Sequence, residues 1–398
     1  MNAPAHEPRR RELMLAALAL LGSVGGCGGV DSGGTGTGAS STYANGPITG
    51  FGSIIVNGVR YDDTSASIDD DEGRPRSRAE LKLGMRAEVL ASPITATAGV
   101  SSATAASIRV RSEILGPLEA IDGPNARLTV LGQTVAVVAT TVFDAALTGG
   151  LAGLVPGDVL EVYATLDLAA GRYVASRIER RGSVAAYKLR GVVTTPALAA
   201  KTFTLGGATI DWSAVAPNDP ASALAPGRFV RVTLAPPPQA NVWRATALTA
   251  GVAKPEDREV AVVEGRISAF TSATNFALDG IPVDASAASF PGGSAGLALG
   301  VRVEINGGLR NGVLVASRVE LDNDEGGPEA FELHGRIDAV DALAQRFVVH
   351  GVTVMWSSTT RFDSSSAGDI AVGRNVEVKG RLSSDGLRVD ATLIHVEL

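Results

Sequence analysis

The sequence predicts an all-β protein made of repeated small domains, and three observations support this fold class. The 398-residue chain is 45% hydrophobic and 19% charged, a balance typical of folded proteins and not of disordered ones. Its 47 glycines, with many Ala, Val and Thr residues, favour short strands and turns over helices. Several elements also recur at nearly regular spacing, and a chain of this length exceeds one ordinary domain. We therefore expect several β-domains in tandem.

The most regular recurring element is a glycine, two residues, then an apolar, a charged and an aliphatic residue. It begins at Gly84, Gly157, Gly227, Gly300 and Gly373. Period-two alternation places its charged residue on one strand face and its aliphatic residues on the other. The charged residues are Glu88, Glu161, Arg231, Glu304 and Glu377. These segments are predicted to be half-buried antiparallel strands, and the glycines before them should occupy turns with positive φ.

Each repeat also opens on a glycine, and a second strand ends on another. The opening glycines are Gly46, Gly116, Gly191, Gly265 and Gly335, which lie 70, 75, 74 and 70 residues apart (116−46, 191−116, 265−191, 335−265). Five short strands in each repeat suit a small OB-like Greek-key barrel, with a small β-sandwich as the alternative. Because so small a unit buries only about 60% of its unfolded surface, neighbouring repeats should pack together.

The predicted organisation has an N-terminal leader, a tether and five β-repeats. The ranges are 1–26 for a lipoprotein signal peptide, 27–45 for a Gly/Ser/Thr tether, and 46–113, 114–183, 184–252, 260–322 and 331–398 for the repeats.

The leader carries an export pattern that ends on the single cysteine. Arg9, Arg10 and Arg11 precede the apolar run 13–24, which is long enough for a signal peptide and too short to span a bilayer. The following Val24-Gly25-Gly26-Cys27 resembles the bacterial lipobox, so we expect Cys27 to carry lipid. By resemblance to the bacterial sorting rule, Gly28 in place of Asp implies an outer-membrane lipoprotein, facing the periplasm or the cell surface.

The opening of the first repeat carries a family resemblance. Residues 46–59, which read Gly-Pro-Ile-Thr-Gly-Phe-Gly-Ser-Ile-Ile-Val-Asn-Gly-Val, are similar to the start of the bacterial domain-of-unknown-function family numbered five-six-six-six. That family occurs as tandem repeats behind lipoprotein signals, and the resemblance extends over 46–398. It implies a fold and a location, and it brings no catalytic residues.

Charge argues against nucleic acid as a partner. The net charge is −7, whereas phosphate binding requires clustered Lys and Arg. Arginine outnumbers lysine by 30 to 5, but the arginines are scattered among acids. We interpret this excess as a compositional bias of a GC-rich genome.

Three patterns could carry chemistry, and each has a simpler interpretation. The run 292–296 matches Gly-x-Ser-x-Gly, but it lies in a variable loop where the strand-turn-helix of a nucleophile elbow is not expected. The acidic runs 69–73 and 322–326 could suit calcium, although neither matches an EF-hand loop, so solvated acidic loops are expected. The histidines His334, His350 and His395 all belong to the fifth repeat; they are weak metal candidates, and we expect no metal or other cofactor.

Aromatic residues offer the remaining weak candidates for a binding site. Trp212, Trp243 and Trp356 could form exposed stacking platforms, while packing in the cores is the alternative. The sequence therefore favours a non-catalytic envelope lipoprotein, anchored in the membrane, whose repeats form an extended binding or spacer array for an unknown envelope ligand or protein. The alternative is a glycan- or peptide-binding protein that uses open barrel faces, and an enzyme is not expected.

Overall fold

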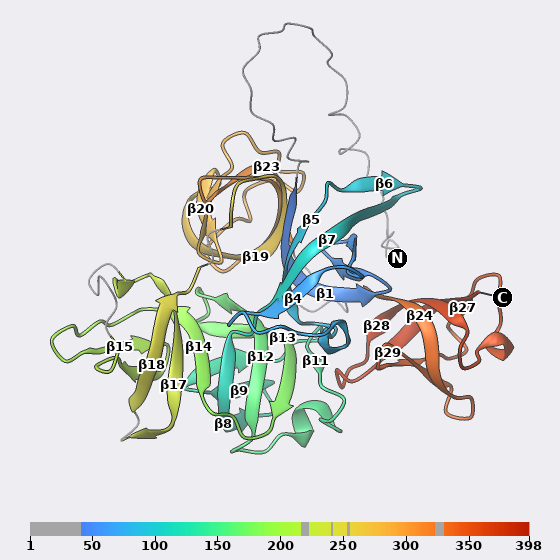
Figure 1. Cartoon of the computed structure of the whole chain (residues 1–398), viewed down its shortest axis with the longest axis horizontal. Helices are drawn as coiled ribbons and strands as arrows, with labels where there is room; N and C mark the ends of the chain where they lie inside the picture. The colour runs from blue at the N-terminus through green and yellow to red at the C-terminus, as the bar shows by residue number, and fades with distance from the viewer. Residues whose placement is uncertain (1–40, 216–222, 240–241, 253–254, 323–329, 398) are drawn as a thin grey trace, which may run out of the picture.

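The structure is a computed structural model that describes residues 41–215, 223–239, 242–252, 255–322 and 330–397. Nearly all of its regular elements are β-strands (Figure 1), so the predicted all-β class is confirmed. Among the described residues, no helix has both the length and the apolar character needed to cross a membrane.

The first two repeats contain strands β1 to β13. The first repeat comprises β1 (Thr42–Phe51), β2 (Ile54–Val56), β3 (Val59–Asp62), β4 (Ser67–Asp70), the 3-10 helix η3 (Arg78–Glu80), β5 (Arg86–Ala91), β6 (Thr95–Thr97) and β7 (Val100–Val110). The second comprises β8 (Ile114–Asp122), β9 (Arg127–Val130), β10 (Gln133–Ala136), β11 (Val142–Phe143), η4 (Gly150–Gly153), β12 (Val159–Asp167) and β13 (Arg172–Arg181).

The last three repeats contain strands β14 to β29. The third comprises β14 (Tyr187–Val192), β15 (Thr202–Leu205), β16 (Ala208–Asp211), β17 (Phe229–Gln239) and β18 (Val242–Ala250). The fourth comprises β19 (Arg258–Ser272), β20 (Asn275–Leu278), β21 (Ile281–Asp284), β22 (Arg302–Arg310) and β23 (Val313–Leu321). The fifth comprises β24 (Ala330–Asp341), β25 (Arg346–Val349), β26 (Val352–Met355), β27 (Arg361–Phe362), η5 (Ala367–Asp369), β28 (Asn375–Leu382) and β29 (Val389–Val396).

The strands of each repeat pair in one closed ring. In the second repeat, β8, β9 and β10 form an antiparallel meander, β10 pairs in parallel with β13, and β12 pairs with both β13 and β8. The same order recurs in the others; in the third, the bridge from Val193 to Leu205 joins the first hairpin. This is the connectivity of a five-stranded Greek-key barrel. The prediction of small five-stranded barrels is therefore confirmed, and two separate sandwich sheets would not close this ring.

The recurring glycines occupy the turns predicted for them. The glycine that precedes the fourth strand has φ of +80°, +97°, +84°, +82° and +87° in the five repeats. At Gly157 an added Cβ would meet nothing within 4 Å, so this position needs glycine for its backbone conformation and not for space. The opening glycine of a repeat is needed for space. At Gly335, for example, an added Cβ would collide with the imidazole of His350.

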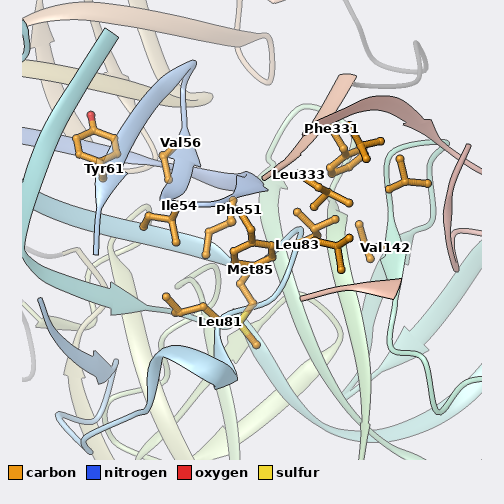
Figure 2. Packing of buried hydrophobic residues seen from close by; sticks show 14 of the residues in the cluster. Phe51, Ile54, Val56, Tyr61, Leu81, Leu83, Met85, Val142, Phe331 and Leu333 are labelled. Carbon is orange, nitrogen blue, oxygen red and sulfur yellow. The ribbon is translucent and has the colours of Figure 1, made fainter. Parts of the chain in front are cut away.

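The hydrophobic cores do not follow the repeats one by one. The first and fifth barrels share one cluster of buried residues, which also receives Val142 and Tyr163 from the second barrel. Figure 2 shows Phe51 and Ile54 of the first barrel in the same cluster as Phe331 and Leu333 of the fifth. The second and third barrels share another cluster, and the fourth has its own, joined by Tyr43.

The first barrel lies at the centre of the molecule (Figure 1). Its strand β1 pairs in parallel with β19 of the fourth barrel over 42–45 and with β24 of the fifth at Gly50 and Phe51. The segment Thr42–Asn45, expected to belong to the tether, is therefore part of a strand. Strands β8 and β14 join the second and third barrels. The repeats form a compact cluster, and the expected extended array is wrong because β1 offers an edge to two barrels that are distant in sequence.

Candidate functional site

The charged residue of the recurring motif forms part of a row across strands one, four and five of each barrel. We call this row the polar row. In the register of the strands it reads Asn45–Glu88–Arg109, Leu115–Glu161–Glu179, Arg190–Arg231–Thr249, Glu264–Glu304–Glu320 and His334–Glu377–His395 in the five barrels. The expected separation of charged and aliphatic faces is confirmed, since Val89, Val162, Val232, Ile305 and Val378 are all buried.

Buried arginines at or near these rows connect different barrels. Arg86 of the first barrel donates from Nη2 to the Glu264 carbonyl of the fourth barrel at 2.9 Å and lies 3.6 Å from the Asp279 carboxylate. Arg190 of the third barrel pairs with Glu113 at 2.9 Å, donates to the Asp279 carbonyl at 3.0 Å, and lies over the ring of Phe229. The arginine excess is therefore structural at these positions, whatever its compositional origin.

Sequence reasoning missed these arginines, although a positional signal was present. Arg190 directly precedes an opening glycine and Arg266 directly follows one. Both are buried, and Arg266 donates to Thr165 of the second barrel at 3.1 Å. An arginine beside a glycine of a core strand could have indicated a cation that reaches across to a neighbouring barrel.

The first acidic run is engaged with protein and not with solvent. Asp71 pairs with Lys188 and Arg231 of the third barrel, and Asp70 pairs with Arg76 at 3.1 Å. Burial lowers the pKa of Arg231 to about 10 and also lowers the pKa of Lys188. The expectation of a solvated loop at 69–73 is therefore wrong. Of the second run, Asp322 pairs with Arg302 at 3.3 Å, and 323–326 lie outside the described residues.

The polar row of the fourth barrel places three carboxylates side by side. Glu304 lies opposite Glu264 on one neighbouring strand and Glu320 on the other. Burial, and next the charge of Glu264, raise the pKa of Glu304 to about 7. Arg302 and Arg318 pair with the outer two carboxylates, while Glu304 accepts a hydrogen bond from Asn306 at 3.3 Å.

The three tryptophans do not form an exposed platform. Each is 6% exposed. The indole of Trp243 meets the Tyr187 ring edge-on at 5.6 Å, and that of Trp356 lies 5.8 Å from the Phe347 ring. Trp212 packs in the core shared by the second and third barrels. The ligand-binding hypothesis for Trp212, Trp243 and Trp356 is therefore corrected to core packing, because barrel closure turns all three indoles inward.

The three histidines lie in the fifth barrel but not as a ligand set. His334 and His350 are neighbours, since the His350 imidazole contacts the His334 carbonyl at 2.8 Å. His395 lies beyond Glu377, because β29 pairs with β28 and not with β24 as expected. Within the described residues, no group of three or more His, Cys, Asp or Glu side chains is arranged to hold a metal ion. Weak or absent zinc binding stays a prediction.

Two further sequence candidates are the Gly-x-Ser-x-Gly run and Cys27. The run 292–296 is an exposed turn between β21 and β22, without the strand-to-helix context that a nucleophile elbow requires. Cys27 lies outside the described residues.

Comparison with known proteins identifies the repeated unit. Residues 116–179, 264–320 and 334–395 match the model of a domain of unknown function (DUF5666). No curated protein matches the chain. A solved structure described as "drosophila Unr CSD456" is 14% identical and covers 54% of this chain and 98% of its own, with a TM-score of 0.14; a likeness this low carries no information on fold or function. Three of the five repeats, the second, fourth and fifth, therefore match this domain of unknown function.

Proposed function

We propose that the protein is a non-catalytic lipoprotein of the bacterial envelope, in which the packed barrels form one rigid body that holds an envelope ligand or protein. The observation that carries this proposal is how the buried charges are used. Arg86, Arg190 and Arg177 each contact a barrel other than their own. Charged groups that a reactive site would require are thus engaged in holding barrels together.

The leader supports the proposed location. Its charged and apolar segments suit export, and an acyl chain on Cys27 together with others would give stable anchoring where one chain alone is marginal. The acidic balance of the chain favours a protein or glycan partner over nucleic acid. Glycan binding by stacking loses its main support, because the three tryptophans are buried.

Two measurements test the proposal. Cells that express the full chain or its Cys27→Ala variant are grown with a labelled fatty acid, and we expect label on the full chain only. Crosslinking in intact envelopes, followed by purification of the full chain, should then recover a reproducible partner that depends on Cys27. Label on the variant would refute the anchor, and turnover of an envelope substrate by the purified chain would refute the non-catalytic role.

A further inference from the structure

A cavity of about 290 Å³ lies between the first and second barrels. The first barrel contributes η3, the loop before β5 and the end of β7, and the second contributes β12, β13 and the loop after β11. The lining residues are Arg76, Ala79, Glu80, Leu81, Lys82, Met85, Val110, Asp144, Tyr163, Glu179 and Arg181. Its volume is near the lower end of the range for small-molecule sites, about 300 Å³.

One side of the cavity is apolar. Leu81, Met85, Val110 and Tyr163 are all buried, and all four belong to the hydrophobic cluster that the first and fifth barrels share. Figure 2 shows Leu81 and Met85 close together. These side chains provide a fixed apolar surface for the hydrocarbon part of a ligand.

The carboxylates of the lining already accept hydrogen bonds from the protein. One oxygen of Glu80 accepts from Arg76 at 3.1 Å and the other from the Ser77 amide at 2.7 Å. Both carboxylate oxygens of Glu179 and of Asp144 are engaged in the same way. Glu179 pairs with Arg177 at 2.6 Å and Arg181 at 2.7 Å, and Asp144 accepts from the Ala146 amide at 2.9 Å and from Arg177 at 3.1 Å.

The unused hydrogen-bonding capacity of the lining consists of donors. The Nε of Arg76 is buried and has no hydrogen-bond partner, which is unfavourable unless a ligand or water accepts from it. Arg181 uses Nε and Nη2 on Glu161 and Glu179, so its Nη1 remains available. The lining carries three cations and three carboxylates, and the neighbouring Arg177, Asp70 and Glu161 keep the charges close to balanced. The unused donors therefore decide the class of ligand, because a carboxylate accepts from a guanidinium N–H and an ammonium group cannot.

We propose that this cavity binds a small carboxylate with an apolar body. The carboxylate accepts from Arg76 and Arg181, one from each barrel, while the hydrocarbon packs on Leu81 and Met85. Such a ligand would bridge the two barrels. The inference goes beyond the proposed scaffold function and does not depend on the lipid anchor.

Calorimetric titration of the full chain with hexanoate tests the proposal. Hexanol and hexylamine serve as probes with the same hydrocarbon and a neutral or positive head. We expect hexanoate to bind at least about tenfold more tightly than hexanol, because hydrogen bonds to a charged acceptor are lost with the alcohol, and we expect no binding of hexylamine. Equal affinity for the three probes, or no heat with hexanoate, would overturn it.

Variants test whether the measured heat comes from binding in this cavity. Ala79 lines the cavity and is exposed, so Ala79→Phe should obstruct it and abolish binding without disturbing a core. Arg181→Gln should weaken hexanoate by about tenfold and leave hexanol unchanged. Arg109→Gln, at an exposed position outside the lining, is the matched control. Thermal unfolding of each variant checks the fold, and hexanoate binding that persists in a folded Ala79→Phe protein would refute the site.

Discussion

The fourth and fifth barrels are attached to the first barrel in different ways. The fifth barrel merges its core with that of the first, so that Phe331 and Leu333 belong to the same buried cluster as Phe51 and Ile54. The fourth barrel keeps a separate core, to which the first barrel adds Tyr43. It joins the first through the parallel ladder of β1 and β19 and through polar contacts made by Arg86.

Barrels of one fold are thus joined by two kinds of interface. Apolar burial is non-directional and scales with the area removed from water. A buried cation needs its acceptors in place, and loss of one partner leaves the other uncompensated. We therefore expect the first and fifth barrels to unfold together, while the fourth responds to single polar substitutions and to pH.

Removing a ring from the shared core should have the largest effect. Phe331→Ala should cost about 3–5 kcal/mol and should increase amide exchange in both the first and the fifth barrel. Phe276→Ala, a matched loss in the core of the fourth barrel, should increase exchange in that barrel alone. Hydrogen exchange with peptide-level resolution measures both. Protection that is lost only in the fifth barrel of Phe331→Ala would show that the two cores are separate.

Replacing the arginine between the first and fourth barrels should have an intermediate effect. Arg86→Gln keeps a polar side chain but leaves the Asp279 carboxylate, 3.6 Å from the guanidinium, without that cation. We expect a cost of about 2–3 kcal/mol, seen in urea unfolding, with faster exchange in β1 and β19. Arg109→Gln on an exposed position serves as control. Unchanged exchange in β19 would mean that the ladder alone holds the fourth barrel.

The fourth barrel should also lose stability as pH rises, which is the smallest effect expected. The pKa of Glu304 is raised from 4.5 to about 7, so between these values the folded state binds more protons than the unfolded state. The stabilisation is complete below about pH 4.5 and is lost as pH rises through 7. Because Glu304 is half-buried, the change should be on the order of 1 kcal/mol.

Glu304→Gln should flatten this pH profile. The carboxylates that face Glu304 are Glu264, Glu320 and Asp322, and Asn306 is its hydrogen-bond donor. The buried Tyr61 of the first barrel also interacts with its charge. The profile is followed by the urea midpoint of the fourth barrel from pH 5 to pH 8, with Glu377→Gln in the fifth barrel as the matched control. An identical slope in the wild type and the Glu304 variant would contradict the assignment.

Sequence alone determined the structure within each repeat. Strand alternation placed Glu88 and Glu304 on the outer face and their aliphatic neighbours inside, and the turn glycines such as Gly157 have the positive φ expected of them. These features are local, because the strand pleat and the turn conformation depend on residues a few positions apart.

The contacts between barrels could be read only from the three-dimensional arrangement. The pattern around Trp212 and Trp243 allowed either an inward or an outward indole, and barrel closure buried both. The partners of Arg86 and Asp71 lie in barrels far along the chain, and no spacing in the sequence identifies them. Contacts between repeats depend on how whole barrel surfaces fit together. The periodicity of a short sequence window reports the structure of one strand and carries no information on that fit.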